Sequence, residues 1–554
     1  MDRLSGCGAA PLTHCRRKGH HLVMTDQSTD RPWSHEIPDG PWDYVVIGSG
    51  IGGMSAAAML SKLGRRVLVL EQHNIPGGFT QMFKRPGYRW DVGVHIVGEM
   101  SQRSYPGRLL RALTDGRLEW EPLGEIYDEF NFPDGFTIQL PDSPEAFRET
   151  LAEYFPTERK AIDEYLALTR NAARSTAKLL QVRAMPRILT PGGRKRATEA
   201  ADPHMSATTA EVLTSLTDDP RLRAVLSAQW GYYGATPARS SFAMHALMVR
   251  HFLRGAYYPV GGASSIAPAL LTTVADAGGW TAVRRTVDSI LQQRGAVAGV
   301  RLSDGSEIAT KRVVSTAGTV PTSNLLESDL PGAIDPYREA GPAHVSLYVG
   351  FKGDIAAHGA ERFCQWYYDS WDMEVAGWDV NPDRIPGTAP VLFCSFPSLK
   401  DPTHDPGPEQ RNTGEAITFV PWDAFSQWSG TRWKRRGASY DTFKEALTTA
   451  LLEQYLTRYP GLASFVDHVE MSTPLSTNHF AASHRGSIYG LGTAPERFHD
   501  ESLRPRTGIK GLYLGGADAS APGIAGALGG GVLAAAAAEP LRGMRFLQPI
   551  MRRP

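Results

Sequence analysis

Residues 43–71 read DYVVIGSGIGGMSAAAMLSKLGRRVLVLE, and this stretch decides the fold. The run from Asp43 to Ile47 is mostly apolar and β-branched, as in a short buried strand. A helix-forming run follows Gly53, and a second strand from Arg66 to Leu70 ends at Glu71. The order strand, glycine turn, helix, strand predicts the first unit of a Rossmann-type α/β domain.

The glycines of this turn have separate physical tasks. Gly48 permits the tight turn, Gly50 lets the backbone approach a pyrophosphate, and Gly53 allows close packing of helix on strand. The amides of the helix N-terminus suit phosphate oxygens, and Glu71 can accept hydrogen bonds from ribose hydroxyls. A carboxylate there would repel a 2′-phosphate, which favours FAD or NAD over NADP. An ordinary βαβ unit without a nucleotide is the alternative.

Three further motifs follow along the chain. The pair Gly77-Gly78 and the run Trp90-Asp-Val-Gly-Val-His95 come soon after the second strand. Near the C-terminus, Gly515-Gly-Ala-Asp518 reads as a turn between a strand and a helix that starts near Gly523. Asp518 cannot attract phosphate, so its plausible partners are hydroxyl groups. Taken alone, however, Asp518 is better explained as a simple turn or helix N-cap residue.

In this order the segments VVIGSGIGGMSAAAML, VLVLEQHNIPGG, DVGVHIVGEM and GLYLGGADASAPGIAGALGGG resemble the FAD-binding half of the phytoene desaturase and amine oxidase superfamily. The similarity is greatest to the branch that includes retinol saturase and carotenoid isomerase. The resemblance implies noncovalent FAD, with the backbone of Val287 at the adenine, Asp518 at the ribityl chain and helix amides at the flavin. The cofactor residues so implied are Gly48, Gly50, Gly52, Gly53, Glu71, Gln72, His73, Gly78, Phe79, Thr80, Gly93, Val94, His95, Val287, Ala317, Gly516, Asp518, Gly523, Ile524 and Ala525. Without the resemblance, the sequence around Val287 does not distinguish it from any other strand residue, so its assignment to the adenine rests on the resemblance.

The spacing of these motifs predicts two interleaved domains. We expect a Rossmann-type FAD-binding domain from residues 41–105, 260–330 and 495–554, after a loose leader at 1–40. Residues 106–259 and 331–494 would form an α+β substrate-binding cap domain, an antiparallel sheet plus helices. The first insertion has helical periodicity at Phe147, Leu151, Tyr154 and Phe155, and the second has the β-rich runs HVSLYVGF, PVLFCSF and AITFVPW.

Composition narrows the class of protein. The 58 Lys and Arg balance 58 Asp and Glu, so the chain has no net positive charge that would attract nucleic acid. Four cysteines without paired spacing fit a reducing, cytoplasmic setting. The uncharged stretch Ala519–Ala538 has its larger apolar residues on one helical face, which predicts a buried helix of a soluble protein. The basic segment Lys178–Arg196 suits either a peripheral membrane contact or a solvated helix and loop.

The insertions also suggest the substrate. Aromatic groups around Trp230, Trp366 and Trp422 suit an apolar tunnel, although ordinary core packing explains any one of them. Histidines lack metal-ligand spacing, so no metal is expected. A second strand-GxGxxG-helix unit is missing between residues 100 and 500, so we expect a separate electron donor or acceptor.

The sequence therefore predicts an FAD-dependent oxidoreductase that saturates, desaturates or isomerises C=C bonds of an apolar polyene or isoprenoid, such as a carotenoid or retinoid. His95 is the catalytic candidate, as a proton donor near neutral pH; a histidine that only bonds backbone is the alternative. Two other functions stay open. One is a flavin amine oxidase, and the other is a non-catalytic prenyl-binding protein of the GDI type.

Overall fold

The computed structural model describes residues 31–554, apart from 187, 189, 328–329, 332–338, 376, 385 and 553–554. Most of the predicted leader, residues 1–30, lies outside the described residues. The rest of it, residues 31–40, is mostly exposed and irregular. Ser34 pairs with the sheet, since its N–H donates to Thr281 O at 3.2 Å and its carbonyl accepts from Val283 N at 2.9 Å.

A five-stranded parallel sheet forms the nucleotide-binding half. Its strands, in spatial order, are β10 (Trp280–Val283), β2 (Val67–Glu71), β1 (Tyr44–Ile47), β14 (Val313–Ser315) and β20 (Leu512–Leu514). The strands come from three stretches of chain that are far apart in sequence. Each predicted FAD segment supplies at least one of them, whereas the exact domain boundaries stay a prediction.

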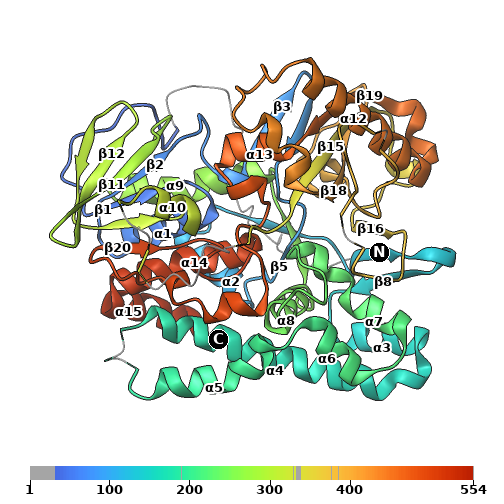
Figure 1. Ribbon diagram of the computed structural model, residues 1–554, viewed down its shortest axis with the longest axis horizontal. Helices are drawn as coiled ribbons and strands as arrows, with labels where there is room; N and C mark the ends of the chain where they lie inside the picture. The colour runs from blue at the N-terminus through green and yellow to red at the C-terminus, as the bar shows by residue number, and fades with distance from the viewer. Residues whose placement is uncertain are drawn as a thin grey trace, which may run out of the picture. The chain divides into compact units, whose positions relative to one another are not determined.

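Both faces of this sheet are covered, which explains why its strands are mostly apolar. Val46 and Val69 face the helices α1 (Ile51–Lys62), α9 (Ile266–Asp276) and α14 (Gly523–Ala538). Val45 and Leu68 point the other way, toward a three-stranded antiparallel sheet of β11 (Val287–Gln293), β12 (Ala296–Leu302) and β13 (Glu307–Ala309). Figure 1 shows α14 and α1 on one side of this half and β11 and β12 on the other.

Helices α1 and α14 cross at glycines. A Cβ atom at Gly531 would lie 2.0 Å from Gly52 O, and one at Gly530 would lie 2.0 Å from Gly516 O. Such distances leave no room for any other residue, so the small residues of α14 serve close packing. The prediction of a buried helix here is confirmed, and among the described residues no helix is long and apolar enough to cross a membrane.

The cap half contains a seven-stranded sheet. Its order is β19 (Val466–Ser472), β15 (Ala343–Lys352), β18 (Arg411–Val420), β17 (Val391–Ser395), β16 (Cys364–Tyr368), β7 (Ile126–Asn131) and β8 (Thr137–Pro141). All neighbouring pairs are antiparallel except β16 with β7. The antiparallel sheet expected from the second insertion is therefore confirmed, and the first insertion adds β7 and β8 to it.

Helices from the first insertion complete the cap. They are α3 (Pro144–Tyr154), α4 (Arg159–Ala184), α5 (Gly193–Ser206), α6 (Thr209–Leu216), α7 (Pro220–Ser227) and α8 (Phe242–Phe252), and α4 packs on α5 and α8. Of the helical pattern predicted there, Phe147, Leu151 and Phe155 are buried, but Tyr154 is 44% exposed.

The remaining elements are β3 (Met82–Arg85), β4 (Tyr88–Asp91), β5 (Val97–Gly98), α2 (Tyr105–Thr114), β6 (Trp120–Pro122), β9 (Ala256–Pro259), α10 (Thr319–Asn324), α11 (Pro397–Lys400), α12 (Ala438–Arg458), α13 (Pro474–Ala481) and α15 (Pro540–Met551).

Candidate functional site

A cavity of about 370 Å³ opens at the carboxyl ends of the parallel strands. Residues at the ends of β1, β2, β14 and β20 line it, together with the N-terminal residues of α1. Ligands of open α/β sheets bind at this edge, where loops diverge and helix N-termini point outward. Sixteen of the twenty predicted cofactor residues line this cavity, and they are Gly48, Gly50, Gly52, Glu71, Gln72, Gly78, Phe79, Thr80, Gly93, His95, Val287, Ala317, Gly516, Asp518, Gly523 and Ile524.

The other four lie outside the cavity lining. Gly53 packs on the turn, where a Cβ would lie 1.9 Å from Gly48 O, as expected of the third glycine. His73 donates its backbone N–H to Glu71 and sets its ring against Phe480. Val94 is fully buried in the core of the nucleotide-binding half, because it alternates with Gly93 along an extended segment. Ala525 borders a second cavity instead.

The glycine turn leaves space where a phosphate would lie. A Cβ atom built on Gly50 would meet nothing within 4 Å, although Gly50 borders the cavity and immediately precedes α1. The first N–H groups of a helix have no partners in the helix itself, and they favour anions. The empty volume over Gly50 and the helix end therefore fit a pyrophosphate.

Glu71 is held so that part of it remains free. Its Oε2 accepts from Ser49 N at 2.9 Å and from Ser49 Oγ at 2.5 Å, and its Oε1 accepts from His73 N at 2.8 Å. A carboxylate has about four acceptor positions, so Oε1 keeps one for a further donor. No Lys or Arg pairs with this carboxylate among the described residues, and a ribose hydroxyl suits its remaining position.

Asp518 joins two loops of the site. Its Oδ2 accepts from Thr319 N at 2.7 Å, at the start of α10, and its Oδ1 accepts from Leu491 N at 3.0 Å. Arg497 ties the Leu491 loop to the turn that holds Asp518, through the carbonyls of Leu491 and Ala517, at 2.8 and 2.6 Å. Each oxygen of Asp518 retains one acceptor position, so the structural role and a role toward a hydroxylated ligand coexist.

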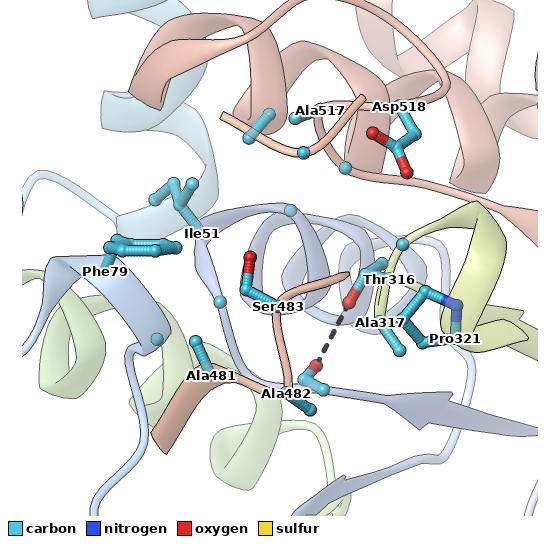
Figure 2. A pocket seen from close by; sticks show the side chains of 18 of the residues that line it. Ile51, Phe79, Thr316, Ala317, Pro321, Ala481, Ala482, Ser483, Ala517 and Asp518 are labelled. Atoms are coloured by element: carbon cyan, nitrogen blue, oxygen red, sulfur yellow. Dashed lines mark hydrogen bonds between the residues drawn. The ribbon is translucent and has the colours of Figure 1, made fainter. Parts of the chain in front are cut away.

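Several lining residues were not foreseen. Thr316 and Gly318 flank the predicted Ala317 at the end of β14. They could have been predicted, because ligands of open α/β sheets bind at the carboxyl ends of the strands. Ala481, Ala482 and Ser483 come from the second insertion, which has no glycine motif there. Figure 2 shows these three residues between Phe79 on one side and Thr316, Ala317 and Pro321 on the other.

A second cavity of about 490 Å³ adjoins the first. Helices α4, α8, α14 and α15 line it, largely with apolar side chains such as Leu180, Val182, Leu247, Met248, Phe252, Val532 and Leu547. The two cavities share Gly93, His95, Tyr489, Gly523 and Ile524. Of the aromatic groups suggested for a tunnel, Tyr232 and Tyr233 border it, whereas Trp230, Trp366, Phe425 and Trp428 are buried in cores.

His95 lies at the junction of the two cavities and against a buried acid. Its Nδ1 is 2.9 Å from Glu415 Oε2 on β18, and Glu415 is completely buried. Burial lowers the pKa of His95 to about 3 and raises the pKa of Glu415 to about 8. At neutral pH the dissociable proton of the pair therefore resides on the carboxyl group, and His95 is not the imidazolium donor that we predicted from its ordinary pKa. Sequence reasoning missed Glu415, whose only signal is an acid inside an apolar strand.

Comparisons with known proteins identify the family and the fold of this chain. Residues 51–538 match the family described as flavin containing amine oxidoreductase. The chain is 33% identical to all-trans-retinol 13,14-reductase from Homo sapiens, over 97% of this chain and 93% of that protein. It is 28% identical to prolycopene isomerase 2 from an Oncidium hybrid cultivar, over 87% and 81% of the two chains. The structure of cyclohexylamine oxidase from Brevibacterium oxydans superposes with a TM-score of 0.55 at 18% identity, covering 93% of this chain and all of the other, which shows a common fold.

Proposed function

The chain belongs to the flavin containing amine oxidoreductase family and is an FAD-dependent oxidoreductase, and we propose that it acts on C=C bonds of an apolar polyene or isoprenoid. One observation carries the substrate class: the apolar second cavity meets the nucleotide cavity at Gly93 and His95. A long apolar molecule in the second cavity would thus present one of its bonds at the junction. The names of the relatives, a retinol 13,14-reductase and a prolycopene isomerase, support a retinoid or carotenoid.

The chain's own residues suggest how FAD is held. Gly50 and the N-terminal amides of α1 would bind the pyrophosphate, Glu71 the adenosine ribose, and Asp518 the ribityl hydroxyls. Gly93 and Ile524, which border both cavities, would then flank the isoalloxazine ring. When bound there, FAD supplies or accepts the electron pair of the reaction. The protein contributes position, exclusion of water and the handling of protons.

An amine substrate fits the second cavity less well. Among the described residues that line it, Glu99 is the acidic one, and its carboxylate lies 3.6 Å from Arg250 and 3.7 Å from Arg254. An ammonium group would have to compete with these two guanidinium groups. A non-catalytic prenyl carrier of the GDI type, for its part, would have little need for the Gly50 and Glu71 arrangement.

The test is a turnover assay with purified holoprotein. After anaerobic reduction with dithionite, all-trans-retinol or a carotenoid should lose conjugation, seen as a blue shift of its absorbance and a mass gain of two hydrogens; isomerisation would change the isomer without a mass gain. A yellow protein that instead forms peroxide with amines would support the amine oxidase. A colourless protein that retains prenyl lipid would support the carrier.

We also propose that electrons are exchanged with a separate partner. The described residues contain one parallel sheet with one glycine-rich turn of the nucleotide-binding type, so a second dinucleotide site has no evident place. NADH or NADPH alone should therefore reduce the flavin slowly, whereas dithionite should reduce it at once. Rapid, saturable reduction by NADPH in anaerobic stopped flow would contradict this.

A lipid surface is the proposed source of substrate. Met544 and Met551 of α15 border the second cavity and are 46% and 45% exposed, so the cavity reaches the surface beside them. Leu541 and Ile188 are also exposed. Helix α15 contains Arg542 and Arg545, and Arg552 follows its last residue. Within the basic segment, Leu179 and Val182 are buried and serve the core, whereas Ile188 is exposed. Exposed apolar side chains among arginines favour an anionic membrane.

A further inference from the structure

A row of polar residues crosses the buried face of the seven-stranded sheet. Glu415 of β18 pairs with Ser395 of β17, and Cys364 of β16 pairs with Asp128 of β7. Gln365 pairs with Cys394, which brings Cys364 beside Ser395. Directly opposed residues of neighbouring strands point to the same face, so the four side chains adjoin. All four are completely buried, although two are acids.

Lys400, at the end of α11, lies over the middle of this row. Its Nζ donates to Ser395 Oγ at 2.7 Å and to the backbone carbonyl of His95 at 3.1 Å, and it lies 3.0 Å from Cys364 Sγ. The side chain is completely buried. Lys400 therefore fixes the backbone at His95 and stands as a cation between the carboxyl groups of Glu415 and Asp128.

Both ends of the row reach the second cavity. His95 contacts Glu415, and the hydroxyl of Tyr232 donates to Asp128 at 2.6 Å. His95 and Tyr232 both border the cavity, and both rings lie against Phe393, with centroids 5.1 and 6.1 Å away. In the cavity wall, His95 and Tyr232 are thus each backed by a buried carboxyl group.

The two ends differ in the hydrogen bonds that they complete, although Asp128 Oδ2 also lacks a partner. Tyr232 has a complete hydrogen bond to Asp128 and also accepts from Trp366 Nε1 at 3.3 Å. At the other end His95 and Glu415 are in contact, but neither ring nitrogen and neither carboxyl oxygen completes a hydrogen bond of good geometry. Leaving such groups unsatisfied in a core is costly, and a pair maintained at that cost points to a chemical role.

We propose that Glu415 is the proton reservoir of the reaction and acts through His95. This inference rests on the proposed C=C chemistry. Saturation adds a hydride equivalent to one carbon, delivered by the dithionite-reduced flavin in the assay, and a proton to the other carbon. The proton leaves Nε2 of His95 as Glu415 passes its own proton to Nδ1, which leaves His95 neutral and Glu415 as a carboxylate near the Lys400 ammonium. Nε2 is buried and has no hydrogen bond, so the ring must turn toward the cavity for the transfer.

The pH dependence follows from where the proton resides. Below about pH 8 Glu415 holds the proton, and above that pH it is lost, so the rate of saturation should fall as pH rises through about 8. The titratable groups that face the pair are Lys400, Asp91, His344, Tyr348, Tyr258 and Tyr455. Burial raises the pKa of Asp91 to about 7, and Asp91 itself bonds Tyr258 and Ala263 N. A Glu415 variant is therefore needed to assign the step near pH 8.

The experiment compares the holoprotein with E415Q, E415D and E470Q in single turnovers of retinol after dithionite reduction. E415Q should be about 100-fold slower or more, with normal FAD content and melting temperature, and should lack the decline above about pH 8. E415D keeps a carboxyl group and should restore that decline at a lower rate. E470Q changes a part-exposed acid of β19, which β15 separates from β18 and which pairs with Arg85, and it should behave as the wild type. Unchanged rate or an unchanged decline in E415Q would overturn the inference.

An infrared titration tests the same residue without turnover. The wild type minus E415Q difference spectrum should contain the carbonyl band of a neutral carboxylic acid at pH 7, and the band should disappear near pH 8. Absence of this band at pH 7 would overturn the inference even if turnover is normal. If the wild type neither reduces nor isomerises polyenes, the proposed function fails, while the infrared band still reports whether Glu415 holds a proton.

Discussion

The two cavities of this chain are built in different ways. The nucleotide cavity is lined largely by backbone and glycine near strand ends. Of its acidic groups, Glu71 is the last residue of β2 and Asp518 lies in the turn after β20. The second cavity is lined by side chains from α4, α8, α14 and α15, which belong to distant parts of the sequence. A site made by backbone geometry leaves a compact motif, whereas a site made by packed side chains leaves none. FAD binding should accordingly be sensitive to the substitution of a single glycine. Substrate binding should instead depend on the combined shape of many side chains.

The largest effect is expected at Gly50. Valine fits the backbone there, since φ is −60° and a Cβ meets no neighbour, but its side chain would occupy the volume proposed for the pyrophosphate. FAD affinity should fall by about 100-fold or more, which corresponds to about 3 kcal/mol, and Gly50→Val should purify folded and colourless. Gly430 also has open space around a Cβ but lies away from both cavities, so Gly430→Val should keep its flavin. Wild-type flavin content in folded Gly50→Val would contradict the placement of the cofactor.

The next effect is expected at the junction of the cavities. His95→Gln removes the group that passes a proton but keeps a polar side chain of similar length. We expect turnover to fall about 100- to 10,000-fold with FAD occupancy retained. Melting temperature should change little, because both ring nitrogens lack hydrogen bonds. Near-normal turnover in an FAD-loaded variant would assign His95 to the scaffold.

The sequence predicted residues at this junction, but it did not predict the buried residues that contact His95. Alternation along an extended segment correctly groups Gly93 with His95, and the same rule explains why Val94 faces the core. Asp91, on the same side by that rule, is instead tied to Ala263 N and Tyr258. Glu415 and Lys400 reach His95 only because β18 and α11 fold beside it from more than 300 residues away. Such pairing depends on strand register across the cap sheet, which no local pattern encodes.

A smaller effect is expected in the wall of the second cavity. Leu247 lies on α8 and borders the cavity, so tryptophan at this position would fill part of its volume. We expect Leu247→Trp to raise KM for a long polyene about 10- to 100-fold, consistent with a loss of about 1 to 3 kcal/mol, and to leave FAD content unchanged. Leu247→Met keeps the volume and serves as the control. Equal KM values for the tryptophan variant and the wild type would place the substrate elsewhere.

The smallest effect concerns the rim of that cavity. Glutamate at Met544 would put a charge where we propose that the rim contacts an anionic bilayer, and it would remove a half-exposed apolar side chain. Burying part of a methionine contributes about 1 kcal/mol, so Met544→Glu should bind vesicles of mixed phosphatidylcholine and phosphatidylserine about fivefold more weakly, as measured by co-sedimentation. Val375 has the same exposed fraction of 46% but borders neither cavity, so Val375→Glu should bind as the wild type does. Equal losses in both variants would show nonspecific adhesion, and no loss in either would remove α15 from the membrane contact. Because Met544 does not line the nucleotide cavity, FAD content should stay constant throughout, which separates the rim from the cofactor site.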